Sequence, residues 1–153
     1  MKKIYLTFIL ILCIFISGCS NTSKEAITSE TFANNATSNN FTYEDNLTSY
    51  SNYNYILSAY IAKYNEDISI EFITYDTEDN AKKVQDSQIK GFNTLKSTGA
   101  AETKDKGKNY YKYILISNNY YMISSRIDNT LVFCKTPLTN KDTVEKLITS
   151  IGY

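Results

Sequence analysis

Apolar and polar residues alternate with a period of two in several parts of the chain, a pattern typical of half-buried β-strands. In residues 68–75 the alternation sets Ile68, Ile70 and Phe72 apart from their neighbours. Strands are predicted at residues 41–43, 55–63, 68–75, 110–117, 120–127 and 130–135. Asn-Asn and Asp-Asn pairs separate the last three strands, and these residues tolerate the positive φ of tight hairpins. The last three strands therefore predict an antiparallel meander.

Apolar residues spaced three and four apart predict three helices. The first begins after Thr28, whose hydroxyl suits an N-cap, and a disordered linker reaching Asn40 is the alternative interpretation. The second begins at Asp76 or Thr77, where acidic residues suit the positive end of a helix. The third closes the chain, and Gly152 follows it at a position that favours a left-handed C-cap.

The order of these elements is helix, three strands, helix, three strands, helix. Strands joined by tight turns favour an antiparallel sheet, and the helices must cover a face of that sheet. We therefore predict an α+β fold with an antiparallel sheet of about five or six strands and the helices packed on one face. Residues 96–109 are rich in Gly, Ser, Thr and Lys and are interpreted as a mobile polar loop.

The beginning of the chain has a different pattern. Lys2 and Lys3 precede an apolar run from Ile4 to Ile16, and small residues follow it. A positive start, an apolar middle and small residues before a break are features of a secretory signal peptide. A transmembrane helix needs about 20 apolar residues, so an uncleaved membrane anchor is the weaker alternative.

The segment Ile16-Ser17-Gly18-Cys19 resembles the lipobox of bacterial lipoproteins. In that family the signal is cut before the cysteine, and the cysteine thiol carries a diacylglycerol. The resemblance implies a signal peptide over residues 1–18, lipidation of Cys19 and membrane lipid as a partner. It also implies that the protein is lipid-anchored to the cell membrane, on the extracytoplasmic face.

The remaining chain suits a short tether and one domain. Residues 19–26 are mostly small and polar and are interpreted as a flexible tether, followed by a single α+β domain over residues 27–153. The 16 basic and 16 acidic side chains of the whole chain balance, and removal of residues 1–18 leaves a net charge of −2. No basic patch for nucleic acid is indicated, so we expect no nucleic-acid partner. We also expect a monomer.

The absence of histidine and tryptophan restricts the chemistry. Histidine is the commonest general base and a common zinc ligand, so Ser-His and Cys-His catalytic centres are excluded. Asp76, Glu78 and Asp79 lack the glycine turn and distal glutamate of a calcium loop, and helix N-terminal charge explains them better. We predict a protein that is not an enzyme, with no catalytic residues, no metal and no cofactor.

The three cysteines reduce to one in the mature chain. Cys13 leaves with the signal peptide and Cys19 is lipidated, which leaves Cys134 without a disulfide partner. Cys134 is interpreted as a buried inert thiol, because free cysteine usually behaves as a small core residue. The alternative is a nucleophilic or redox thiol beside Lys135, which would act without a histidine.

Tyrosine is the unusual residue of the domain, with 14 copies in the chain. One group is Tyr50, Tyr53, Tyr55, Tyr60 and Tyr64, and the second group, in the meander, is Tyr110, Tyr111, Tyr113, Tyr120 and Tyr121. A tyrosine side chain brings large area, a hydroxyl group and little entropy loss, which suits protein or sugar contacts. The second group is our candidate ligand surface, and the alternative is that tyrosine is simply a good strand residue.

The chain is similar to a family of small lipoproteins of low-GC Gram-positive bacteria. The similarity rests on the lipobox, on residues 70–83 and 120–130, and on the ending Ile151-Gly152-Tyr153. It implies no activity and no catalytic residues.

Three functional hypotheses follow. The first is a non-catalytic binding module for a protein, peptide or envelope ligand, and a sheet packed on both faces would count against its tyrosine surface. The second is a protective or inhibitory lipoprotein that blocks a secreted enzyme or toxin, with residues 96–109 as the contacting loop. The third is a small carboxylate-based hydrolase, which needs a pocket with two facing acids.

Overall fold

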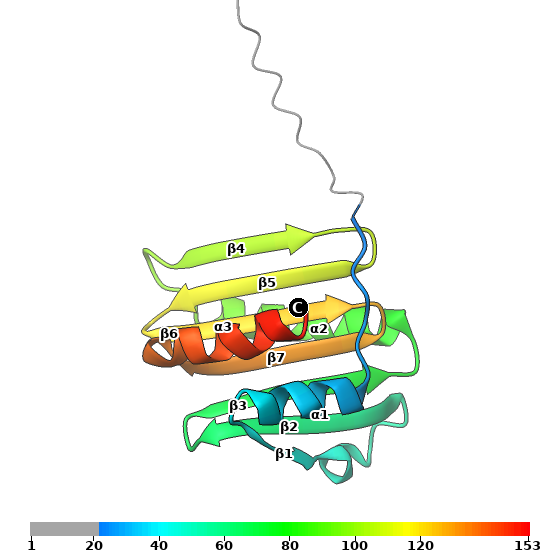
Figure 1. Cartoon of the computed structure of the whole chain (residues 1–153). Coiled ribbons are helices and arrows are strands. Elements are labelled where there is room, and N and C mark those ends of the chain that lie inside the picture. Colours follow the sequence, from blue (N-terminus) through cyan, green and yellow to red (C-terminus); the bar gives the residue numbers. More distant parts are fainter. Residues whose placement is uncertain (1–21) are drawn as a thin grey trace, which may run out of the picture.

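The computed structural model describes residues 22–153, which form one open antiparallel sheet of seven strands with three α-helices (Figure 1). The strands are β1 (Thr42–Asp45), β2 (Ile56–Asn65), β3 (Ile68–Tyr75), β4 (Ala101–Lys106), β5 (Tyr110–Ser117), β6 (Tyr120–Ile127) and β7 (Thr130–Pro137). The helices are α1 (Ser29–Ser38), α2 (Glu78–Asn93) and α3 (Lys141–Ser150), with the short 3-10 helices η1 (Leu47–Tyr50) and η2 (Leu138–Asn140). The predicted α+β class is confirmed.

The strand order is β1-β2-β3-β7-β6-β5-β4, and every neighbouring pair is antiparallel. The predicted meander of β5, β6 and β7 is present. The pairing of β3 with β7 joins it to the sheet formed by the first half of the chain, with Phe72 opposite Val132. This central pair lies between elements that are far apart in the sequence.

The sheet has more strands than the five or six predicted, because residues 96–109 are not a mobile loop. Within them β4 pairs with β5 along its whole length, from Ala101 opposite Ile116 to Lys106 opposite Tyr111. The side chains of β4 are almost all exposed, so it has no apolar alternation to detect. Backbone hydrogen bonds hold this edge strand, and lysine-rich polar edges are a common protection against aggregation.

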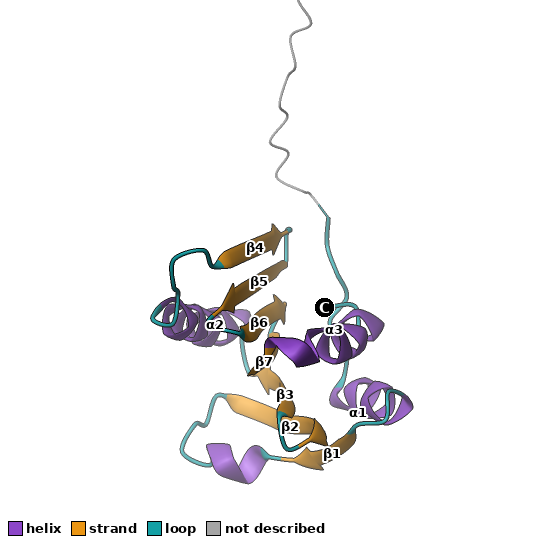
Figure 2. Cartoon of the chain, turned by 90° about the vertical axis from the view of Figure 1, so that its left-hand side faces the viewer, coloured by secondary structure: helices purple, strands orange, loops and turns teal. Residues whose placement is uncertain are grey.

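The helices cover both faces of the sheet and not one face as predicted. Figure 2 shows α2 on one side, and α1 and α3 on the other. The reason lies in the central strands, which are apolar at both odd and even positions. Phe72 of β3 belongs to the core under α1 and α3, and the next residue, Ile73, belongs to a separate cluster with Ala81 of α2. A strand buried on both faces needs a helix on each side.

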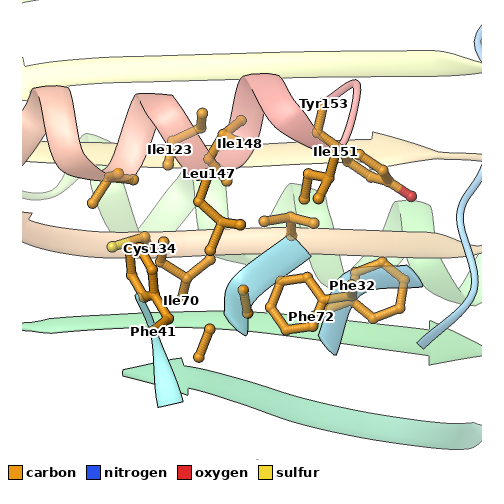
Figure 3. Packing of buried hydrophobic residues seen from close by; sticks show 14 of the residues in the cluster. Phe32, Phe41, Ile70, Phe72, Ile123, Cys134, Leu147, Ile148, Ile151 and Tyr153 are labelled. Carbon is orange, nitrogen blue, oxygen red and sulfur yellow. The ribbon is translucent and has the colours of Figure 1, made fainter. Parts of the chain in front are cut away.

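The larger core lies between the sheet and the pair α1 and α3 (Figure 3). The ring of Phe32 stacks on the ring of Phe72 with centroids 5.0 Å apart, and Tyr153 meets Phe72 edge-on at 6.3 Å. The hydroxyl of Tyr153 shares a hydrogen bond with Thr130, and its backbone N–H donates to the Ile148 carbonyl at 3.0 Å. The end of the chain is therefore part of the core.

The local signals of the sequence are confirmed. The Thr28 and Thr77 hydroxyls accept from the N–H groups three residues ahead, at 3.1 and 3.2 Å, and so cap α1 and α2. Asn118 and Asn119 have φ of 51° and 65° in the β5–β6 turn. Gly152 has φ of 80° after α3, the left-handed conformation that glycine adopts without strain.

The segment before α1 lies on the domain. The backbone N–H of Lys24 donates to Asn109 Oδ1 at 3.0 Å, and Asn109 Nδ2 returns a bond to the Lys24 carbonyl at 2.8 Å. Lys108 N–H donates to the Thr22 carbonyl at 2.9 Å. Residues 22–24 of the predicted flexible tether are thus bound to the turn between β4 and β5, and Ala26 packs against the larger core. The predicted signal peptide and Cys19 lie outside the described residues.

Over residues 22–153, no helix combines the length and the apolar content needed to span a membrane.

Phe72→Ala is expected to lower the free energy of unfolding by about 3–5 kcal/mol, because it removes a fully buried ring between Phe32 and Tyr153. Urea denaturation followed by circular dichroism measures this change. Leu57→Ala is the control, because Leu57 is 58% exposed. A loss at Phe72 no larger than the loss at Leu57 would contradict the described core.

Candidate functional site

The predicted ligand surface is mostly inside the protein. Tyr110, Tyr113 and Tyr121 are 5%, 1% and 0% exposed, so they belong to the core and offer no surface. Tyr111 is partly buried, and Tyr120 is 41% exposed with Lys135 Nζ 4.8 Å from its ring centroid. The five tyrosines therefore form no continuous exposed surface. The cause is the coverage of both sheet faces, which buries tyrosines on either side.

The tyrosines that precede β2 form a pocket instead. It has a volume of about 330 Å³ and lies on the α2 face of the sheet, beside the loop that carries η1. We call it the tyrosine pocket, and its lining consists of Tyr50, Tyr53, Tyr55, Ile56, Ile73, Tyr75, Val84, Gln88 and Phe133. Its walls come from the η1 loop, from the strands β2, β3 and β7, and from the helix α2.

Aromatic rings make most of the wall on the η1 side. The Tyr53 and Tyr55 rings meet edge-on with centroids 5.7 Å apart, and Tyr50 lies 6.4 Å from Tyr53. Tyr55 also stacks on Tyr75 at 6.3 Å. The four rings form a series of contacts in the order Tyr50, Tyr53, Tyr55 and Tyr75. Tyr53 lies between Tyr50 and Tyr55 in this series and remains 48% exposed.

Glu71 adjoins the pocket through three of its lining residues. It stands two residues before Ile73 on β3 and directly opposite Phe133 of β7, and its Oε2 accepts a hydrogen bond from the Tyr50 hydroxyl. Burial raises the pKa of Glu71 above its ordinary value, and the hydrogen bond from Tyr50 opposes part of this rise. Among residues 22–153, no lysine or arginine forms an ion pair with Glu71.

Two further polar groups lie at the pocket. Tyr75 is fully buried, and its hydroxyl has no hydrogen-bond partner within the described part of the chain. Burial raises the pKa of Tyr75, so the phenol stays protonated at neutral pH. Gln88 lines the pocket from α2, and its Oε1 accepts from the Ser124 hydroxyl at 2.9 Å. Ser124 thus fixes the position of this amide.

The other candidate residues have structural explanations. Cys134 is 1% exposed in the main core and is a free thiol, and burial raises its pKa to about 12, which suppresses the reactive thiolate. Asp76 Oδ1 accepts a bond from Asn80 Nδ2 at 2.7 Å, and Glu78 pairs with Lys82 and Arg126. The described residues contain no group of three side chains that would hold a metal ion.

The sequence shows the tyrosines at residues 50–55, but the candidate surface was predicted on the tyrosines of the meander, three of which are buried. The signal for the pocket was their density in a stretch without strand periodicity. Glu71 and Gln88 carried no signal, because each is one polar residue in an ordinary strand or helix. Only the fold brings the hydroxyl of Tyr50 to Glu71.

Comparisons with protein-family models, with curated proteins and with solved structures give no match to this chain. The geometry of the tyrosine pocket is therefore the basis on which a function is proposed.

Glu71→Gln is expected to change how the free energy of unfolding depends on pH. Because the pKa of Glu71 is raised in the folded state, the folded chain holds this proton more tightly than the unfolded chain. Wild-type stability should therefore fall as the pH rises from the ordinary value of 4.5 through the folded pKa. Glutamine has no proton to lose, so the stability of the variant should increase relative to that of the wild type over this pH range.

Urea denaturation at a series of pH values from about 3 to about 8 measures this difference. Glu66→Gln makes the same change of charge at an exposed position in the β2–β3 turn and serves as the control. Tyr50→Phe removes the hydrogen bond that opposes the effect of burial, so it should raise the pKa of Glu71 in the folded state further. The pH-dependent loss of stability should then extend to higher pH than in the wild type. A difference between Glu71→Gln and wild type that is constant with pH would refute the assignment.

Proposed function

We propose that this protein is a lipid-anchored, extracytoplasmic lipoprotein that acts as a non-catalytic binding module for a protein, peptide or envelope ligand. The tyrosine pocket carries the proposal. Ligand sites are typically concave and mostly apolar, with a few polar groups that fix orientation, and this pocket has that composition. The binding surface is thus assigned to the pocket and no longer to the tyrosines of the meander.

The alternatives have less support. The inhibitor hypothesis used residues 96–109 as a protruding loop, and β4 takes up the middle of that segment as a sheet strand. The hydrolase hypothesis requires two facing carboxylates, and the tyrosine pocket adjoins Glu71 while none of its nine lining residues is acidic. These observations favour the binding module over the other two.

The position of residues 22–24 supports a tethered receptor. They are bound at the β4–β5 turn, and a chain from Cys19 to Thr22 spans at most about 11 Å. A lipid on Cys19 would hold this edge of the domain close to the membrane. The pocket floor on β3 is four strand positions from β4, about 19 Å away at ordinary strand spacing. The anchored protein would present its pocket on the half of the sheet away from the lipid.

Cys19→Ser is expected to release the protein from the membrane fraction, because at least two acyl chains are needed for firm anchoring and the variant has no thiol at position 19 to acylate. Metabolic labelling with an alkyne fatty acid, followed by fractionation, measures both effects. Cys13→Ser is the matched control, because it removes a thiol from the predicted signal peptide and keeps the lipobox. Equal labelling of the Cys19→Ser variant would reject lipidation at this residue.

Tyr53→Ala is expected to abolish capture of the ligand without unfolding the domain, because Tyr53 lines the pocket and its side chain is 48% exposed. The domain would be immobilised, exposed to solubilised envelope of the source cell and crosslinked, and the captured species identified by mass spectrometry. Tyr43→Ala is the control, because Tyr43 is 50% exposed on β1 and is not part of the pocket. A partner retained by Tyr53→Ala, or lost equally with Tyr43→Ala, would contradict the assignment of the pocket.

A further inference from the structure

One oxygen of the Glu71 carboxylate is left without a partner. Oε2 accepts the hydrogen bond of Tyr50, and no hydrogen bond or ion pair from residues 22–153 reaches Oε1. Removing a carboxylate from water without a cationic partner is unfavourable, and this one is half-buried beside an apolar pocket. Glu71 is not one of the nine lining residues, but it lies directly beside the pocket, and its Oε1 is not among the fully buried atoms that lack a partner. A carboxylate without a cationic partner among residues 22–153 therefore stands next to the pocket.

Three lysines on elements that contribute to the pocket make other contacts. Lys63 of β2 forms an ion pair with Glu44, and Lys135 of β7 lies over the ring of Tyr120. Lys82 of α2 pairs with Glu78 at 3.1 Å. No lysine or arginine of residues 22–153 forms an ion pair with Glu71, so its carboxylate is available to a cationic ligand.

The aromatic wall can also attract a cationic ligand. The face of a tyrosine ring attracts a cation placed over it, and the attraction grows as water is excluded. Tyr50, Tyr53, Tyr55 and Tyr75 place four such rings in contact around the pocket. The Tyr50 hydroxyl is already bonded to Glu71, so ring and carboxylate form one unit.

We infer that the tyrosine pocket binds the primary ammonium group of a lysine side chain from a polypeptide ligand, with Glu71 as its counter-ion. The inference rests on the proposed binding function and names the ligand class of the same site. The apolar stem of lysine would pack on Ile56, Val84 and Phe133, which line the pocket. An ammonium group has three donors, and a quaternary ammonium has none. Glu71 Oε1 accepts no hydrogen bond from residues 22–153 and is open to such a donor, which favours the primary amine.

The test uses residues 20–153, which contain every residue of the fold described above, and two model ligands. Nα-acetyl-lysine methylamide has the ammonium group, and Nα-acetyl-norleucine methylamide has a matching apolar chain without it. NMR titration of backbone amides gives both dissociation constants. The lysine ligand is expected to bind about tenfold more tightly, with shifts concentrated at the pocket.

Glu71→Gln keeps the shape of the side chain and removes its charge. It is expected to weaken the lysine ligand about tenfold and to leave the norleucine ligand unchanged. Glu66→Gln in the exposed β2–β3 turn is the matched control and should change neither constant. Acidification that protonates Glu71 should reproduce the effect of Glu71→Gln on the lysine ligand. Thermal unfolding of each variant establishes that the fold is retained.

Equal affinities for the two ligands would overturn the inference, as would lysine binding that Glu71→Gln leaves unchanged. The same holds if neither ligand shifts the pocket amides up to its solubility limit, or if choline binds more tightly than the lysine ligand. The proposed function is tested separately. If Tyr53→Ala abolishes envelope capture while lysine shows no preference, the binding module stands and only the lysine assignment is rejected.

Discussion

The pairing of β3 with β7 is the constraint on which the rest of the structure depends. It joins a unit from the first half of the chain to the meander of the second half, with Ile70 opposite Cys134 and Ile73 opposite Leu131. The two pairs lie in different hydrophobic clusters, so the middle of the sheet is apolar on both faces. One helix layer cannot cover such a sheet. The placement of α2 opposite α1 and α3 follows from this requirement (Figure 2).

The tyrosine pocket arises where the cover on the α2 face changes from one element to another. The α2 helix packs over one part of the sheet, and the loop with η1 covers β2 and β3 beside it. Aromatic side chains line the space between the two elements, and Glu71 remains next to it with one bonded oxygen. Local departures from a fully matched interior are expected where a protein binds a ligand. Glu71, which has a hydrogen bond from Tyr50 but no cationic partner among residues 22–153, is the departure from which the preference for lysine is inferred.

The sheet also separates the proposed lipid anchor from the tyrosine pocket. Residues 22–24 are bound at the β4–β5 turn, and the pocket lies on β2, β3 and β7. The polar β4 edge therefore lies beside the proposed anchor, while the aromatic pocket stands several strands away. A rigid sheet between them would hold the pocket at a set distance from the membrane without a long linker.

The sequence by itself determined the elements whose signals are contained within a few residues. Thr28 and Thr77 cap their helices, Asn118 and Asn119 form a hairpin turn, and the period-two pattern of residues 68–75 places β3. Tertiary structure alone decided the rest. The pairing of β4 uses backbone hydrogen bonds that leave no pattern in its side chains. Which tyrosines are exposed depends on which faces the helices cover, and the contact of Tyr50 with Glu71 depends on long-range strand pairing, so neither is encoded in local spacing.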